Sequence, residues 1–243
     1  MRIAGRRLGG WAGLAFCVGL AVVILGACDF QRRAENPVER RATWFSYLSG
    51  TDIQRNCWSG SAERYRLIYN ARYPDHVRTY EITGLHEAEG GVLDVEVFSP
   101  RHDPTLSIRL PLWPWKGQRA IAPLTGDDMA AVRASLKLSG AFARPQIGVK
   151  LDSASYYWVV TGCLDGRFFF NGFAWPSEAW SGLAFPDIIA RFDRSEIPVA
   201  APAEGDEPLH DTLDRPAVAQ NEAEDAMRFI ATLTRRGIVA GAR

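Results

Sequence analysis

The side chains best suited to acid–base, metal or nucleophilic chemistry are scattered along this chain of 243 residues. Its four histidines fall in predicted turns or in a predicted linker: His76, His86, His102 and His210. No H-x-x-x-H, H-E-x-x-H or C-x-x-C spacing supports a metal site, and neither G-x-S-x-G nor a phosphate-binding glycine loop occurs. The sequence therefore assigns no catalytic residue, metal or cofactor, and it favours a non-catalytic protein over an enzyme.

The N-terminus has the parts of an export signal. Three arginines precede an unbroken apolar run over residues 14–25, which is shorter than a bilayer span of about 20 residues. The segment Leu25-Gly26-Ala27-Cys28 follows, and it resembles the lipobox of bacterial lipoproteins. This resemblance implies cleavage before Cys28 and acylation of its sulfur, as with palmitate. A plain signal peptide or an uncleaved anchor is the alternative.

The residue after the lipobox bears on location. Asp29 resembles the inner-membrane retention signal of Gram-negative lipoproteins. We therefore expect a protein held by a lipid at Cys28 on the cell inner membrane and facing the periplasm. The whole chain has a net charge of zero, and the 216 residues left after removal of residues 1–27 have a net charge of −3. Neither value suits a nucleic-acid-binding protein.

Two cysteines remain once the signal and the lipidated residue are set aside. In an oxidising envelope compartment, the pair Cys57 and Cys163 predicts one disulfide. Two buried free thiols, or one nucleophilic cysteine, are the alternatives.

Aromatic side chains near predicted strand ends and loops give the other lead. Trp113, Trp115, Trp175 and Trp180 form a candidate binding surface for a protein or glycan partner in the envelope. The alternative is that these tryptophans fill the core between a sheet and its helices.

Alternating apolar and polar residues predict an antiparallel meander over residues 64–70, 79–82, 93–97 and 105–112. Its polar face changes sign from strand to strand, through Arg64, Arg66, Glu81, Asp94, Glu96 and Arg109. Strands that pair in sequence order place basic residues beside acidic ones. A solvated, ion-paired face is favoured over a charged ligand site.

Further elements follow the meander. Thr125-Gly126-Asp127-Asp128 predicts the start of a helix, and Asp165-Gly166 predicts a tight turn between strands over residues 155–163 and 167–175. Residues 185–192 are a candidate to pack inward through Ile188, Ile189 and Phe192.

The whole pattern predicts an α+β fold: an antiparallel meander sheet of about six strands, packed helices, and a C-terminal helix after a flexible linker. A small β-barrel or sandwich with helices is the alternative. The expected organisation is a signal peptide (1–27), a lipidated tether (28–41), a globular domain (42–196), a linker rich in Pro, Ala and acidic residues (197–220), and a C-terminal amphipathic helix (221–243).

The expected protein is thus a membrane-tethered envelope lipoprotein with a non-catalytic binding or accessory role. The alternative is an envelope hydrolase whose catalytic Asp, Glu or His residues the sequence does not assign.

Overall fold

The structure is a computed structural model that describes residues 44–73, 75–85, 89–99, 117–203, 206 and 229–241. Residues 44–48 are helical. The later elements are α3 Thr51–Arg55, β1 Arg64–Ala71, β2 His76–Gly84, β3 Gly91–Phe98, β4 Gln118–Leu124, α5 Gly126–Leu138, β5 Lys150–Asp152, β6 Tyr156–Leu164, β7 Arg167–Ala174, α6 Glu178–Ser181, α7 Phe185–Ala190, β8 Ile230–Thr234 and β9 Gly237–Gly241. Over these described ranges, every helix is too short or too polar to cross a membrane.

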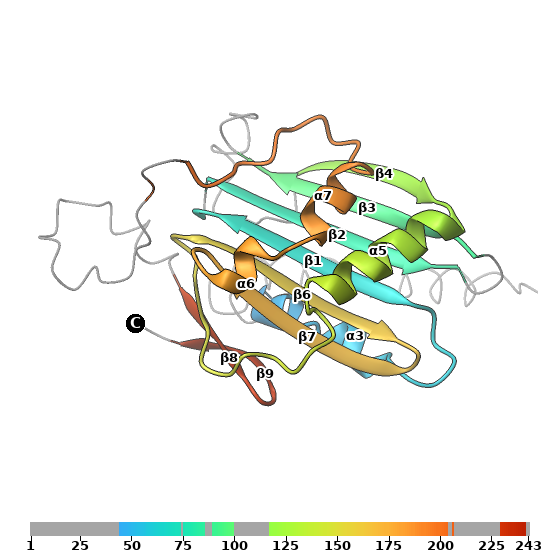
Figure 1. Ribbon diagram of the computed structural model, residues 1–243, viewed down its shortest axis with the longest axis horizontal. Helices are drawn as coiled ribbons and strands as arrows, with labels where there is room; N and C mark the ends of the chain where they lie inside the picture. Colours follow the sequence, from blue (N-terminus) through green and yellow to red (C-terminus); the bar gives the residue numbers. More distant parts are fainter. Residues whose placement is uncertain are drawn as a thin grey trace, which may run out of the picture. The chain divides into compact units, whose positions relative to one another are not determined.

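Six strands form one antiparallel sheet in the order β4-β3-β2-β1-β6-β7 (Figure 1). β1 lies inside the sheet because it pairs on both sides, so that Arg66 faces Glu81 of β2 and Thr161 of β6. The sheet stays open, with β4 and β7 at its edges. The first of the two architectures expected from the sequence, an α+β fold on a meander sheet, is therefore confirmed.

The apolar core lies on one face of this sheet. Leu67 faces Tyr80 and Val160 across the neighbouring strands, and all three side chains point to the same side because strand side chains alternate. Figure 1 shows α5, α6 and α7 lying across that side. Val132 and Leu136 of α5 are fully buried against it. This burial of apolar surface is the main force that holds the helices on the sheet.

Local sequence sets two of the boundaries. Thr125 caps α5 through a capping box, in which its hydroxyl accepts from the Asp128 N–H (3.2 Å) and the Asp128 carboxylate accepts from the Thr125 N–H (2.8 Å). Asp165 and Gly166 both have positive φ, 52° and 71°, as a two-residue hairpin turn requires. The predicted helix start and the predicted β6–β7 hairpin are both confirmed.

The opposite face of the sheet is covered by two different structures. The three-stranded sheet β5-β8-β9 covers part of it, and a Cβ atom on Gly172 would lie only 2.8 Å from a methyl carbon of Leu233. The N-terminal helical segment (residues 45–55) covers another part, where a Cβ atom on Gly50 would lie 2.8 Å from Thr161. Glycine therefore permits close packing at both places.

The predicted C-terminal helix is wrong over residues 230–241, which form the hairpin β8–β9. Residues 221–228 lie outside the described part of the chain. Burial alternates along β8, with Ala231 and Leu233 fully buried between more exposed neighbours, and this period of two belongs to a strand. Gly237 has φ of +136°, which suits a turn and interrupts a helix.

The strand beside β3 also differs from the expected one. The strand predicted at residues 105–112 lies outside the described residues, and β4 pairs with β3 in the structure. β4 has no counterpart among the strands predicted from the sequence. Pro123 lies within it and has no N–H for the ladder, which is tolerated because β4 is at the sheet's edge.

The first residues of the expected linker are bound to the core face of the sheet. The buried Arg78 forms an ion pair with Asp193 and donates to the carbonyl oxygen of Ile197. The Tyr69 hydroxyl donates to the carbonyl oxygen of Ala200. The chain after α7 is therefore anchored over residues 193–200 before it leaves the described region.

Candidate functional site

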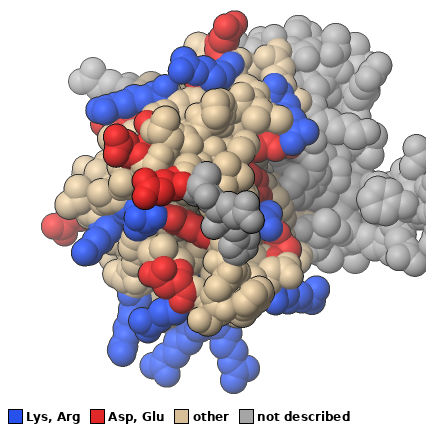
Figure 2. Space-filling view, turned by 90° about the vertical axis from the view of Figure 1, so that its right-hand side faces the viewer, with Lys and Arg blue, Asp and Glu red and all other residues tan. Residues whose placement is uncertain are grey.

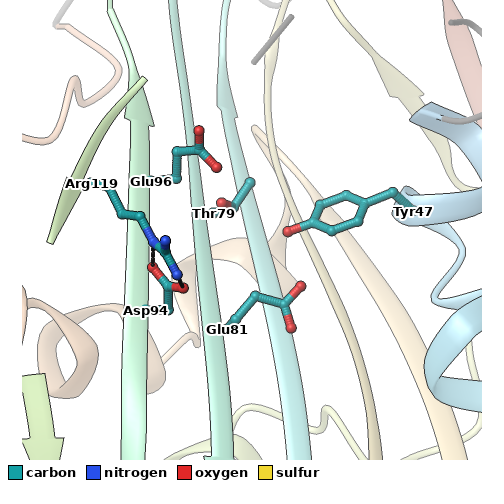
Figure 3. A pocket seen from close by; sticks show the side chains of 6 residues that line it. All are labelled: Tyr47, Thr79, Glu81, Asp94, Glu96 and Arg119. Carbon is teal, nitrogen blue, oxygen red and sulfur yellow. Dashed lines mark hydrogen bonds and ion pairs between the residues drawn. The ribbon is translucent and has the colours of Figure 1, made fainter. Parts of the chain in front are cut away.

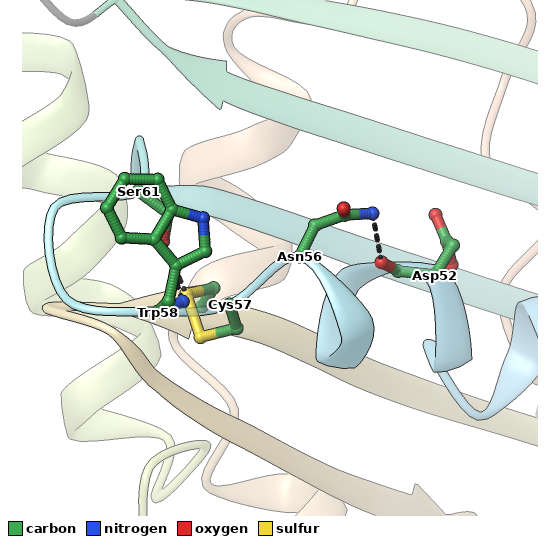
Figure 4. Close-up of a disulfide and its surroundings, with 6 residues drawn as sticks. Asp52, Asn56, Cys57, Trp58 and Ser61 are labelled. Atoms are coloured by element: carbon green, nitrogen blue, oxygen red, sulfur yellow. Dashed lines mark hydrogen bonds between the residues drawn. A yellow bond between two sulfur atoms is a disulfide. The ribbon is translucent and has the colours of Figure 1, made fainter.

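A disulfide joins Cys57 and Cys163, with their Cα atoms 5.5 Å apart, and confirms the predicted pairing (Figure 4). Cys57 lies two residues after the end of α3, whereas Cys163 is buried near the end of β6. The Ser61 hydroxyl lies 3.3 Å from the Cys163 sulfur and accepts from the Trp58 N–H (3.3 Å). The bond therefore fixes the N-terminal helical segment to the sheet.

Arg66 forms the second connection between this segment and the sheet. Its guanidinium, only 2% exposed, donates to both carboxylate oxygens of Asp52 (2.7 and 2.8 Å) and to the carbonyl oxygen of Tyr47 (2.9 Å). It also pairs with Glu81 and lies 3.7 Å from the centre of the Tyr47 ring. Such a two-pronged pair with a carboxylate fixes direction as well as distance.

A neighbouring arginine shares these carboxylates from a more exposed position. Arg64 lies 3.3 Å from Glu81 and 3.5 Å from Asp52. On the far side of the sheet's polar face, Arg119 of β4 holds Asp94 of β3 through its Nε atom (2.8 Å) and a second contact. The predicted pairing of bases with acids is confirmed for β1 and β2. Arg109 lies outside the described residues, and Arg119 is the basic partner of β3.

These contacts enclose a polar pocket of about 230 Å³ on the β2, β3 and β4 strands (Figure 3). Its lining consists of Tyr47, Thr79, Glu81, Asp94, Glu96 and Arg119. Thr79 faces Glu96 and Glu81 faces Asp94 across the β2–β3 ladder, so these four side chains share one face. Figure 3 shows the Tyr47 hydroxyl reaching toward Thr79 from the N-terminal helical segment.

Glu96 is the electrostatically unusual member of the pocket. Its carboxylate accepts a hydrogen bond from the Gly117 N–H (3.2 Å), but no ion pair joins it to any described residue. Partial burial raises its pKa to about 7, and the neighbouring Asp94 adds to this effect. Burial also raises the pKa of the Tyr47 phenol well above its usual value, and the charge of Glu81 contributes to it. Glu96 therefore changes charge near neutral pH while Tyr47 stays protonated.

The pocket is rich in groups that accept hydrogen bonds. Three carboxylates and two hydroxyls face it, whereas Arg119 is its one cationic lining residue. Glu81 and Asp94 already hold arginines, so Glu96 is the lining carboxylate with the greatest capacity to accept from a ligand. Among the described residues, no cluster of His, Cys, Asp or Glu has the arrangement of a metal site.

Of the tryptophans predicted as a binding surface, the two that the structure describes do not line this pocket. Trp113 and Trp115 lie outside the described residues, as does the lipidation candidate Cys28. Trp175 and Trp180 are half-buried and pack against the core cluster, with ring centres 5.6 Å from Tyr156 and 6.2 Å from Tyr69.

His76, the one histidine among the described residues, does not line this pocket. His76 is buried in β2, where its ring lies edge-on to Tyr69, and the other three histidines lie outside the described residues.

The three carboxylates of this site could be predicted from the sequence, whereas Tyr47 and Arg119 could not. The alternation of Glu81, Asp94 and Glu96 placed three carboxylates on one face, but as an ion-paired surface. Tyr47 and Arg119 come from segments that pattern analysis could not align with that face. Comparisons with known protein families, curated proteins and solved structures find no match to this chain.

Proposed function

We propose that this chain is a membrane-tethered lipoprotein of the bacterial envelope with a non-catalytic binding or accessory role. The lipobox-like segment that ends at Cys28 supports the tether. The Cys57–Cys163 disulfide supports an oxidising compartment, because such bonds persist in secreted and periplasmic proteins and are rare in the cytosol. Asp29 favours the inner membrane over the outer one.

The polar pocket is the observation that carries the binding role. Its acceptors suit a ligand that offers several hydrogen-bond donors, and hydroxyl and amino groups of an envelope glycan fit this description. A volume of about 230 Å³ admits a single sugar-sized group rather than a protein segment. The ligand we propose is therefore a glycan fragment that carries a free amine, which pairs with the Glu96 carboxylate.

The lipid anchor is tested by metabolic labelling with a fatty acid. Label should attach to the wild-type protein and not to the Cys28→Ala variant. Label on the variant would remove the basis for the tether. The Cys57→Ala variant is the matched control, since it also removes one thiol but keeps the proposed acceptor.

The ligand is tested by calorimetric titration of the purified full chain with amine-bearing cell-wall glycan fragments. Glu96→Gln keeps the shape of the side chain and removes its charge, and loss of one charge-assisted hydrogen bond weakens binding by about tenfold or more. Asp187→Asn, an exposed change on α7, is the matched control and should bind like wild type. Equal affinity of wild type and Glu96→Gln would reject the pocket as the ligand site.

A second function, glycan hydrolysis, rests on one specific observation. Glu96, with its pKa raised to about 7, stands beside Asp94, whose carboxylate is paired with Arg119. An acid of raised pKa beside a second carboxyl group is the pairing that glycoside hydrolases use. Product formation from the same glycan fragments, lost in Glu96→Gln, would favour this function over binding alone.

A further inference from the structure

One edge of the molecule carries basic side chains in excess. Figure 1 places β7, the β8–β9 hairpin and the loop before β5 along its lower margin, and Figure 2, turned about the vertical axis, shows Lys and Arg along that same margin. Together with β5 and the β6–β7 turn, these segments contain five exposed bases, which we call the basic edge: Arg144, Lys150, Arg167, Arg235 and Arg236. The same segments contain two carboxylates, Asp152 and Asp165.

The bases of this edge differ from those of the sheet's polar face. The arginines on the face are paired, as Arg66 is with Asp52 and Glu81. No ion pair joins any base of the basic edge to another described residue. Their charge is therefore available to an external anionic partner.

Large apolar side chains are exposed beside these bases. Trp58 is 63% exposed, and Ile147 and Val239 are each more than half exposed. Ile147 lies in the loop before β5 and Val239 in β9, so both belong to the segments of the basic edge. A surface that combines exposed apolar groups with unpaired bases has the composition of a lipid-contacting surface.

The backbone of Trp58 is held in place, although its side chain is exposed. It follows the disulfide-bonded Cys57 (Figure 4), and its backbone N–H donates to the Ser61 hydroxyl. Its backbone also packs against the β6–β7 turn, where a Cβ on Gly166 would lie 2.7 Å from the Trp58 carbonyl carbon. A tryptophan whose backbone is fixed in this way loses little backbone freedom when it meets a partner, so binding costs less entropy. Arg167 directly follows Gly166 of that turn.

From these observations we infer that the basic edge, with Trp58, Ile147 and Val239, rests on the anionic surface of the membrane that carries the lipid anchor. This inference depends on the anchor at Cys28 proposed above. The chain between Cys28 and residue 44 spans at most about 55 Å, so the described part stays near the bilayer. At that high local concentration of lipid, a weak surface contact suffices to orient the protein.

The orientation has a consequence for the polar pocket. β7 lies at one edge of the sheet, while the pocket lies on β2, β3 and β4 toward the other. With strands about 4.8 Å apart, four strand spacings separate β7 from β3 by about 19 Å. A protein resting on its basic edge therefore holds the pocket away from the lipid headgroups, where a periplasmic ligand can reach it.

Quenching of tryptophan fluorescence by bromolipids tests this contact. The full chain, purified with its anchor, is placed in vesicles of phosphatidylcholine alone or with phosphatidylglycerol. Quenching should appear with phosphatidylglycerol, decline at high salt, and decrease in Trp58→Phe. The double variant Arg235→Gln/Arg236→Gln should contact the surface about 25-fold less strongly, because each base near an anionic membrane contributes about a fivefold effect.

Arg191→Gln/Arg194→Gln is the matched control. It removes two exposed arginines that follow α7, which Figure 1 shows away from the lower margin, and it should leave quenching unchanged. Equal quenching in both double variants would overturn the inference. Quenching that is equally strong with and without phosphatidylglycerol would overturn it as well. Salt-sensitive self-association in detergent without lipid quenching would assign the edge to a second copy of the chain instead. Fatty-acid labelling of the same samples separates these outcomes from failure of the anchor.

Discussion

Removal of the Cys57–Cys163 disulfide should destabilise the protein strongly. The two cysteines are 106 positions apart in the sequence. A cross-link that closes a loop of this length lowers the entropy of the unfolded chain by an amount worth about 4.8 kcal/mol at 25 °C. A typical domain is stable by only about 5–15 kcal/mol. The double variant Cys57→Ala/Cys163→Ala should therefore lose a large share of its stability.

Urea unfolding followed by tryptophan fluorescence measures this loss. A slope of about 2–3 kcal/mol per M converts 4.8 kcal/mol into a midpoint about 2 M lower in urea. Wild-type protein in reductant should unfold at nearly the same midpoint as the double variant, because both lack the bridge. Ser61→Ala removes the hydroxyl beside the Cys163 sulfur and keeps the bridge, so it should cost less than about 1 kcal/mol.

Two outcomes would refute the reasoning. A loss below about 1 kcal/mol in the double variant would mean that the bridge does not act through the entropy of the unfolded chain. A loss in Ser61→Ala as large as that in the double variant would place the stabilisation in local contacts of the Cys57 loop. Agreement between reduced wild type and the double variant would exclude cavity formation at Cys163 as the main cause.

Three further results are expected. Arg66→Met should lower the free energy of unfolding by about 3 kcal/mol. Arg64 pairs with the same carboxylates but is 35% exposed, so Arg64→Met should lower this free energy by less than about 1 kcal/mol. In urea unfolding, Leu233→Ala should lower the free energy of unfolding by about 2–5 kcal/mol, because Leu233 is buried where the hairpin docks on the sheet. Val239 is exposed, so Val239→Ala should lower it by less than about 0.5 kcal/mol. The free energy of unfolding of Glu96→Gln should equal that of wild type at pH 4 and exceed it by about 1 kcal/mol at pH 8.

The sign of the last prediction follows from proton linkage. Glu96 has a folded pKa of about 7, above its usual value of 4.5, so the folded state binds more protons between these two values. Its contribution to stability is complete below the lower value and is lost as the pH rises through the upper one. Because the side chain is half-exposed, solvent screening keeps the effect near 1 kcal/mol. Glutamine resembles the protonated acid and should show no such loss in melts recorded across this range.

Part of the central sheet could be predicted because some of its strands show in their own sequence which side chains face the core. In β3, Leu93, Val95 and Val97 are buried while Asp94 and Glu96 alternate with them on the other face. This period of two is visible in the sequence and needs no knowledge of the partner strand. The disulfide was predictable for a similar reason, since only two cysteines were left to pair.

The C-terminal hairpin could not be predicted in this way. Ile230 and Leu233 fit one stripe of a helix, but Ala231 and Leu233 fit one face of a strand equally well. Packing decided between them: Leu233 reaches the surface above Gly172, which has no side chain to prevent the approach. A contact between residues 61 positions apart leaves no trace in the local pattern, and tertiary packing then overrides local propensity.

The polar pocket shows how far charge patterning extends. The alternation of Glu81, Asp94 and Glu96 predicted a shared face, and it correctly predicted the ion pairs of Glu81 with the arginines of β1. It could not predict which acid lacks a base, because Arg119 comes from a strand with no clear alternation. The candidate site depends on this unpaired acid, since Glu96 has no salt bridge to a described residue and its carboxylate can bind a ligand.

Arg66 couples the stability of the protein to the geometry of this pocket. It holds the Tyr47 backbone and ring on one side and the Glu81 carboxylate on the other, and both residues line the pocket. Its other partner, Asp52, lies in α3, which the disulfide fixes only two residues past its end. Loss of Arg66 therefore displaces two lining residues together. Glu96 and Asp94 depend on β3 and β4 and keep their positions. A ligand that contacts Tyr47 and Glu81 as well as Glu96 should then bind Arg66→Met more weakly than wild type, with the remaining affinity still sensitive to Glu96→Gln.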